Sequence, residues 1–222
     1  MPQQPIPTKL HESPTTALES LSKGNYVACL GSEHYITSIE GNDLIPHDWQ
    51  DERKRGVMTI KMIPGYQDFD LANGTPPGVA MFARGQGTKR EDITDGMAQT
   101  IIISELLTWD GDASNPAYSE DIRGVWTCGS MGASTYSHMF GPNSRSPDRI
   151  NSCESRIPNR NPLHCESAPP MGPESGETWA SARSDHLNGV LAAKADGSVK
   201  FYGDAIHLPV WQALATRAGE DN

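Results

Sequence analysis

The sequence predicts an α+β fold with a single antiparallel sheet of about five to seven strands, few short helices and long irregular loops. Three observations predict it. Only 36% of the residues are hydrophobic, while 21 are glycine and 17 are proline, which suits a sheet protein with much irregular chain. The strand-like runs are short and are separated by turn-forming residues. Near the end of the chain, Asp196-Gly197 joins two such runs, and this pair favours a two-residue hairpin turn.

Residues 1–24 contain four prolines among polar residues and predict a flexible lead-in to one domain over 25–222. Residues 99–107 are β-branched and apolar on both faces, which is typical of a central strand. Residues 90–96 resemble a helical turn. Further short strands are expected over 25–30, 57–63, 78–82 and 124–129.

The last forty residues predict a hairpin, a short loop and a short helix. The hairpin strands are expected over 189–195 and 198–202, with the turn at Asp196-Gly197. Pro209 suits the first turn of the helix, and Gly219 suits its C-terminal cap. One face of this helix is expected to carry Val210, Trp211, Leu214 and Ala215.

Residues 130–183 are rich in glycine, proline, serine and asparagine, and they predict a long loop region. Cys153 and Cys165 lie in a segment with little apolar surface, so a disulfide between them is expected to order it. Such a bond persists in an oxidising compartment. Two interpretations stay open for Cys29 and Cys128: they form a second disulfide, or each is a small buried residue of a strand.

A family resemblance rests on three ordered stretches. His186, nine residues, and then Asp196-Gly197-Ser-Val-Lys-Phe, followed by Ala-Leu-Ala-Thr-Arg-Ala-Gly219, resembles the H-x9-D-G domain proteins. The stretch 25–31 fits the same family, as does 78–82 leading to 91–105. This very large family of unknown function is abundant in planctomycetes and usually has a prepilin-type N-terminus.

The resemblance implies a pilin-like or pseudopilin-like head, located outside the cell or on the periplasmic side of the envelope. It implies partners among other envelope subunits or other copies of the chain. Its members typically carry an apolar N-terminal helix, and we find no apolar run of about 18 residues here. We expect either a head cut from a longer precursor, which is the preferred interpretation, or a member without the anchor. Membrane attachment would then depend on that missing helix, and one sheet face is expected to expose apolar residues.

Charge excludes two partner classes. The formal net charge of −10 argues against nucleic acid, because phosphate binding needs a basic face. It also argues against docking on anionic lipid.

Several residues are candidates for chemistry. His186 and Asp196 would lie ~30 Å apart along a straight strand, so we interpret them as structural, His186 at a loop–strand junction and Asp196 with Gly197 in the turn. Glu105 is a candidate acid without a located partner. No cofactor is expected, although calcium is an alternative at an EF-hand-like spacing and zinc at a looser set of soft ligands. The calcium set is Asp110, Asp112, Ser114 and Asp121; the zinc set is Cys128, His138, Cys153, His164 and Cys165.

Two function classes follow. The first is a non-enzymatic envelope or surface protein that acts in assembly, filament formation or adhesion. The alternative is an extracytoplasmic solute- or glycan-binding module with Trp49, Trp126 or Trp179 and the loops of 130–183 as its platform. An enzyme is the least favoured class, because no nucleophile elbow, phosphate loop or dinucleotide fingerprint occurs.

Overall fold

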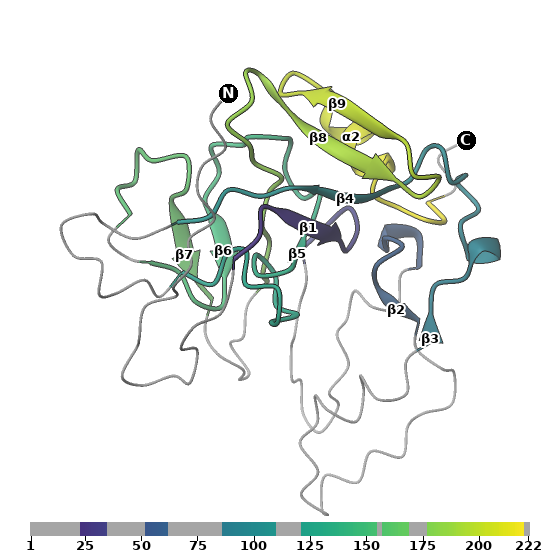
Figure 1. The fold of residues 1–222 in the computed structure, drawn as a ribbon, viewed down its shortest axis with the longest axis horizontal. Helices are drawn as coiled ribbons and strands as arrows, with labels where there is room; N and C mark the ends of the chain where they lie inside the picture. Colours follow the sequence, from purple (N-terminus) through teal and green to yellow (C-terminus); the bar gives the residue numbers. More distant parts are fainter. Residues whose placement is uncertain are drawn as a thin grey trace, which may run out of the picture.

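The computed structural model describes residues 23–34, 52–61, 86–109, 121–154, 157–168 and 177–219. Within them the fold is α+β, built around one main sheet (Figure 1). The sheet has five strands in the order β5-β1-β4-β8-β9. These strands are β1 (Tyr26–Cys29), β4 (Ile101–Glu105), β5 (Thr135–Tyr136), β8 (Gly189–Lys194) and β9 (Val199–Gly203).

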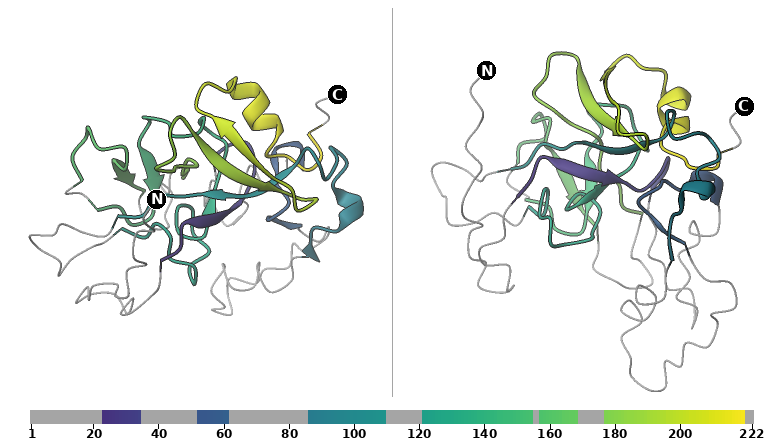
Figure 2. Two further views of the ribbon diagram at one scale, coloured as in Figure 1. Left: turned by 45° about the horizontal axis from the view of Figure 1, so that its top comes forward. Right: turned by 45° about the vertical axis from the view of Figure 1, so that its right-hand side comes forward.

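Two small sheets and three short helices complete the described fold. In both views of Figure 2, the pairs β2–β3 and β6–β7 lie at opposite ends of the main sheet. Their bounds are β2 (Ile60–Lys61), β3 (Gln86–Gly87), β6 (Asp148–Ile150) and β7 (Cys165–Ser167). The helices are the 3-10 turns η2 (Glu52–Lys54) and η4 (Arg90–Asp92) and the α-helix α2 (Leu208–Ala213). None of the described helices is long and apolar enough to cross a membrane.

The main sheet is antiparallel except at one edge, where β5 pairs with β1 in parallel. The expected central strand is β4, which lies between β1 and β8. The expected hairpin is β8–β9, but its turn differs from the expected two-residue turn. The Lys194 amide donates to the Ser198 carbonyl and the Gly197 amide donates to the Lys194 carbonyl, so residues 195–197 form the loop, and of these three only Gly197 has a positive φ, 86°. Glycine suits this turn because it reaches positive φ without a Cβ clash.

One face of the main sheet is covered. Val27, Ser104 and Ala192 lie opposite one another across β1, β4 and β8 on this face, and Val190 pairs with Tyr202 of β9 on the same face; all five are buried. Helix α2 packs here, with its buried Trp211 set against the ring of Tyr202 at 5.5 Å between centroids. Figure 2 shows α2, in yellow, lying against this side of the hairpin.

Two predicted strands differ from the structure. Residues 124–129 form turns rather than a strand, because Gly124 takes a φ of 80° and the amides of Val125 and Cys128 bond back three residues. In 57–63, β2 occupies Ile60–Lys61 and 57–59 form a turn that Thr59 closes by donating to the Gly56 carbonyl. The strand expected over 78–82 and the lead-in over 1–22 lie outside the described residues.

The last helix is shorter than predicted. It ends at Ala213, and the amide of Gly219 donates to Asp95 Oδ2 instead of capping it. Trp211 and Ala215 are buried as expected, whereas Val210 is exposed.

The region 130–183 is more ordered than its composition suggests. It holds β5, β6 and β7 and contributes buried side chains to the core, among them Tyr136, His138 and Ile150. Buried ion pairs and a disulfide stabilise its described parts. Such interactions do not produce a periodic pattern of hydrophobic residues, so the sequence did not indicate them.

Candidate functional site

The motif residues bracket strand β8. His186 precedes β8, and Asp196 and Gly197 form the turn that follows it. Asp196 Oδ1 accepts bonds from the amide and the hydroxyl of Ser198, at 2.9 and 2.6 Å, and these bonds lower the pKa of Asp196. The nine-residue spacing therefore spans one six-residue strand and its two flanking turns.

His186 has a partner that the sequence did not reveal. Its Nε2 lies 3.1 Å from Glu105 Oε1, and Glu105 Oε2 accepts the amide of Leu191 at 2.7 Å. Glu105 is nearly buried, while the His186 side chain is part-exposed. The pair thus connects the entry of β8 to the end of β4. The two residues are 81 positions apart, so no local signal could have found this contact.

In the described part of the chain, the second face of the main sheet is partly exposed. Alternation and register place Tyr26, Ile103, Leu191, Val199 and Phe201 on it. Tyr26, Val199 and Phe201 are exposed, and Ile103 and Leu191 are half-buried. We call this set the open face. The Glu105–His186 pair borders it.

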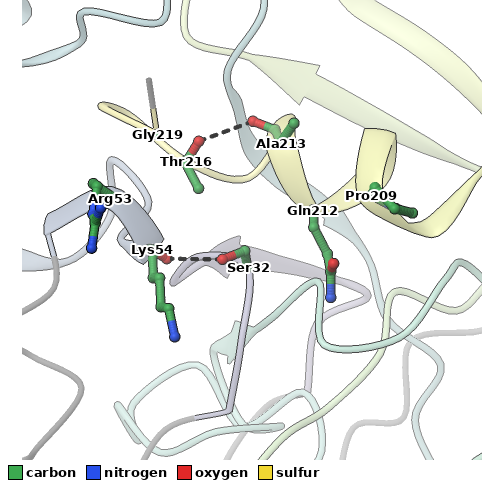
Figure 3. A pocket seen from close by; sticks show the side chains of 8 residues that line it. All are labelled: Ser32, Arg53, Lys54, Pro209, Gln212, Ala213, Thr216 and Gly219. Atoms are coloured by element: carbon green, nitrogen blue, oxygen red, sulfur yellow. Dashed lines mark hydrogen bonds between the residues drawn. The ribbon is translucent and has the colours of Figure 1, made fainter. Parts of the chain in front are cut away.

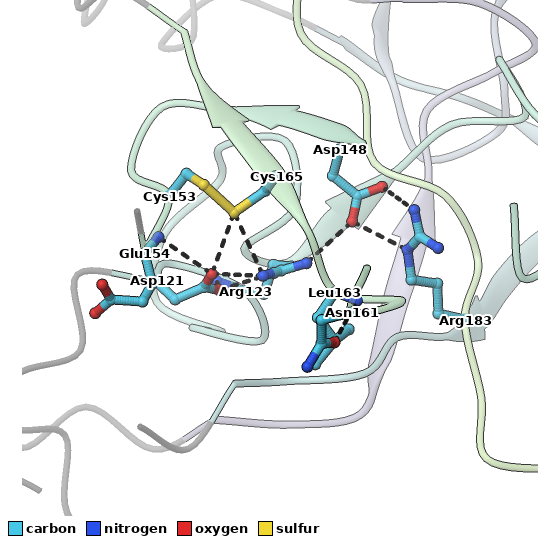
Figure 4. Close-up of a disulfide and its surroundings, with 9 residues drawn as sticks. All are labelled: Asp121, Arg123, Asp148, Cys153, Glu154, Asn161, Leu163, Cys165 and Arg183. Carbon is cyan, nitrogen blue, oxygen red and sulfur yellow. Dashed lines mark hydrogen bonds and ion pairs between the residues drawn. A yellow bond between two sulfur atoms is a disulfide. The ribbon is translucent and has the colours of Figure 1, made fainter. Parts of the chain in front are cut away.

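A buried charge network holds the region 121–183 together (Figure 4). Arg123 forms two bonds to Asp121, at 2.8 and 2.6 Å, and reaches Asp148 at 3.3 Å. Arg183 donates to both oxygens of Asp148 and to the carbonyls of Ser144 and Ser146. Burial alone would lower the pKa of the Arg123 guanidinium, but the two carboxylates outweigh it and raise the pKa. Two positive and two negative side chains therefore balance in a site that is buried from solvent.

The expected disulfide between Cys153 and Cys165 is present beside this network. Cys165 Sγ lies 3.5 Å from Arg123 Nη2. The alternative bond between Cys29 and Cys128 is wrong, since both are free thiols. Cys29 is buried next to Tyr136, and burial raises the pKa of its thiol to about 12. Cys128 Sγ instead bonds to Ser130 Oγ at 3.3 Å.

The zinc set is also wrong. Two of its five members, Cys153 and Cys165, are joined to each other. His138 is buried with its ring stacked on Trp211 at 3.7 Å, and it bonds to the Tyr136 hydroxyl and the Trp211 carbonyl. No group of three potential ligands comes together in the part of the chain that the structure describes.

Asp121, the last residue of the predicted calcium set, is engaged elsewhere. Asp121 has no exposed surface and is engaged by Arg123 through both carboxylate oxygens, so it is not placed as a loop ligand. Asp110, Asp112 and Ser114 lie outside the described residues.

The two described tryptophans of the expected platform, Trp126 and Trp179, lie in different environments. Trp126 is 62% exposed and packs over Gly24. Trp179 is half-buried, donates to the Pro147 carbonyl at 2.8 Å and lies under Arg149. Trp49 lies outside the described residues.

A hollow of about 390 Å³ lies between α2 and η2 (Figure 3). Most of its polar groups bond within the chain. Lys54 pairs with Glu33 at 2.7 Å, Thr216 donates to Asp95 at 2.8 Å, and Ser32 donates to the Lys54 carbonyl. The hollow therefore offers a ligand few unengaged polar groups. Its lining is Ser32, Arg53, Lys54, Pro209, Gln212, Ala213, Thr216 and Gly219.

The fold and site define an α+β protein with one main sheet, one open sheet face and a disulfide-bridged charge cluster. Residues 47–208 match the model of a family described as proteins of unknown function (DUF1559), and the chain belongs to this family. No curated protein and no solved structure gave a match.

Proposed function

We propose that this chain is a non-catalytic protein of the cell envelope or cell surface, with a pilin-like head of the H-x9-D-G type. It acts in surface assembly, filament formation or adhesion, and its partners are envelope subunits or further copies of itself. The observation that carries the proposal is the open face, because a sheet face with exposed Tyr26, Val199 and Phe201 is typical of an interaction surface.

The motif geometry supports a structural role. His186 bonds to a carboxylate that also holds the Leu191 amide, and Asp196 is engaged in the turn. Both ends of β8 are thereby fixed, which sets the register of the sheet that carries the open face. Under this proposal, an apolar N-terminal helix of the prepilin type would attach the head to the membrane.

The disulfide supports an extracytoplasmic location. Structural disulfides persist in oxidising compartments and are rare in the cytosol. Cys153 and Cys165 close a loop that has little apolar surface, so this loop depends on the disulfide for its order. The protein is therefore expected to work in a compartment where the bond persists.

Cell fractionation combined with thiol trapping tests the proposal. The native protein is expected in the envelope or extracellular fraction, with Cys153 and Cys165 resistant to alkylation until a reductant is added. A Cys153→Ser/Cys165→Ser variant gives the control for labelling of Cys29 and Cys128 alone. Recovery in the cytoplasmic fraction with all four cysteines reactive would refute the location and the proposed role.

A further inference from the structure

The outer edge of β9 is open to another strand. In the described part of the chain, β9 is the last strand of the main sheet and pairs with β8 alone. The Asp204 amide donates to the Asn188 carbonyl, and the Lys194 amide donates to the Ser198 carbonyl. Hydrogen-bonded pairs recur at every second residue of an antiparallel ladder, so Lys200 and Tyr202 direct their main chain toward β8. Val199 and Phe201 therefore direct theirs away from the sheet.

The same two residues carry exposed apolar side chains. Val199 is 64% exposed and Phe201 is 45% exposed, both on the open face. Proteins usually protect such an edge with charge, proline or a bulge, since unpaired strand groups recruit other strands. The one lysine of β9, Lys200, is on the other face, where its Nζ lies 5.6 Å from the Tyr202 ring. The edge thus combines unpaired main-chain groups with apolar side chains.

We propose that β9 pairs with β9 of a second copy in antiparallel orientation, about a two-fold axis at Phe201. The main sheets of two molecules then form one continuous sheet, and the open faces become contiguous. This inference rests on the proposed assembly role and names the partner.

Charge and strand length select the register. Phe201 is the middle residue of Val199–Gly203, so an axis through it pairs the whole strand with its copy. Lys200 then lies opposite the partner's Tyr202, and Val199 lies opposite the partner's Gly203.

An axis moved to Lys200 gives a less favourable pairing. It sets Lys200 opposite its own copy and Asp196 opposite Asp204, and like charges directly opposite each other destabilise a sheet. An axis moved to Tyr202 leaves Val199 opposite the turn that follows the strand. The register at Phe201 avoids both.

Sedimentation velocity on the purified chain over a range of concentrations tests the pairing. The native protein is expected to show a monomer–dimer equilibrium. Val199→Lys places a charge on the edge and is expected to raise the dimer Kd by about tenfold or more. Met58→Lys is the matched control, because Met58 is an exposed apolar residue in another segment, and it should leave the Kd unchanged. A chain that stays monomeric, or an equal effect of both variants, would overturn the proposal.

Cysteine cross-linking tests the register independently of Val199. In a Cys128→Ser background, Phe201→Cys is expected to give a disulfide dimer with diamide, since directly opposite Cα atoms lie about 5.5 Å apart. Lys200→Cys should not, because its two copies lie diagonally, about 7–8 Å apart and beyond disulfide reach. Cross-linking through Lys200→Cys in preference to Phe201→Cys would refute the Phe201 axis.

These experiments fail separately from the fractionation test. An envelope protein that is monomeric in solution would refute the β9 pairing and leave the proposed location standing. A dimer with this register, formed by a protein found in the cytoplasm, would support the β9 pairing and refute the proposed location.

Discussion

The imidazole of His138 is buried between two aromatic rings. It lies 5.4 Å from the Tyr136 ring and is stacked on the Trp211 ring at 3.7 Å. With Nδ1–H donating to the Trp211 carbonyl, Nε2 accepts from the Tyr136 hydroxyl at 3.0 Å. Both ring nitrogens are thus used by a neutral imidazole, and burial lowers the pKa of His138 to about 3.

This low pKa predicts a specific loss of stability in acid. Above about pH 6.5, His138 is neutral in the folded and the unfolded chain and has no effect. Between about pH 6.5 and pH 3, His138 is protonated in the unfolded chain but stays neutral in the folded chain. The free energy of unfolding therefore falls by about 1.4 kcal/mol for each pH unit below 6.5.

Urea denaturation of the native chain and a His138→Gln variant at pH 7 and pH 5 measures the effect. Glutamine keeps a donor and an acceptor but does not titrate. The native chain is expected to lose about 2 kcal/mol more than the variant between these pH values. Equal losses would show that His138 is protonated normally in the folded state.

At the scale of elements, the β8–β9 hairpin was predictable because its signal is local. Gly197 supplies the positive φ that the turn needs, and the flanking residues supply β-prone side chains, but the length of the loop, three residues rather than two, was not predicted. The central strand β4 was predictable from its β-branched residues Ile101, Ile102 and Ile103. The turns at 124–129 were not, because their main-chain direction depends on Gly124 packing closely against Gly24, a hundred residues away in the sequence.

Gly197 provides a test of the turn. A Cβ at this position meets no atom within 4 Å, so a Gly197→Ala change adds backbone strain without a steric clash. With φ at 86°, alanine is expected to lower the free energy of unfolding by about 1–2 kcal/mol. Gly129 also has open space but no positive φ, so Gly129→Ala is the control and should be close to neutral. Thermal unfolding of the two variants isolates the backbone strain at Gly197, and equal shifts would argue against this turn.

The disulfide segment was predictable in part. Its two cysteines are 12 residues apart in a chain region without apolar periodicity, and this is enough to suggest the bond. The neighbouring guanidinium of Arg123 could not be predicted, because it approaches Cys165 from 42 residues away.

Removing this bond is expected to lower the free energy of unfolding by about 3 kcal/mol, mainly by freeing the unfolded loop. The measurement is the urea midpoint with and without reductant. A Cys153→Ser/Cys165→Ser variant should show no further loss with reductant, and a Cys29→Ser/Cys128→Ser variant should retain the full response. A native midpoint that is insensitive to reductant would contradict this account.

At the scale of the molecule, the main sheet and the region 121–183 share one core. Tyr136 and Ile150 belong to the same buried cluster as Val27 and Val190. The Arg183 amide donates to the Glu105 carbonyl at the end of β4, and the Ser181 amide donates to Asp148 Oδ1. These bonds link the charge network to the sheet that carries the open face.

Asp148→Asn tests whether this linkage is cooperative. The change leaves Arg123 and Arg183 buried with one carboxylate fewer, and breaking a buried pair in this way lowers the free energy of unfolding by about 3–5 kcal/mol. Asp185→Asn, at an exposed position, is the matched control. Hydrogen exchange should then show lost protection in β8 and β9 as well as in 121–183, because a shared core unfolds as one unit. If protection fell in 121–183 alone, the single domain expected over 25–222 would divide into two units, and the charge network would stabilise only the segment that contains it.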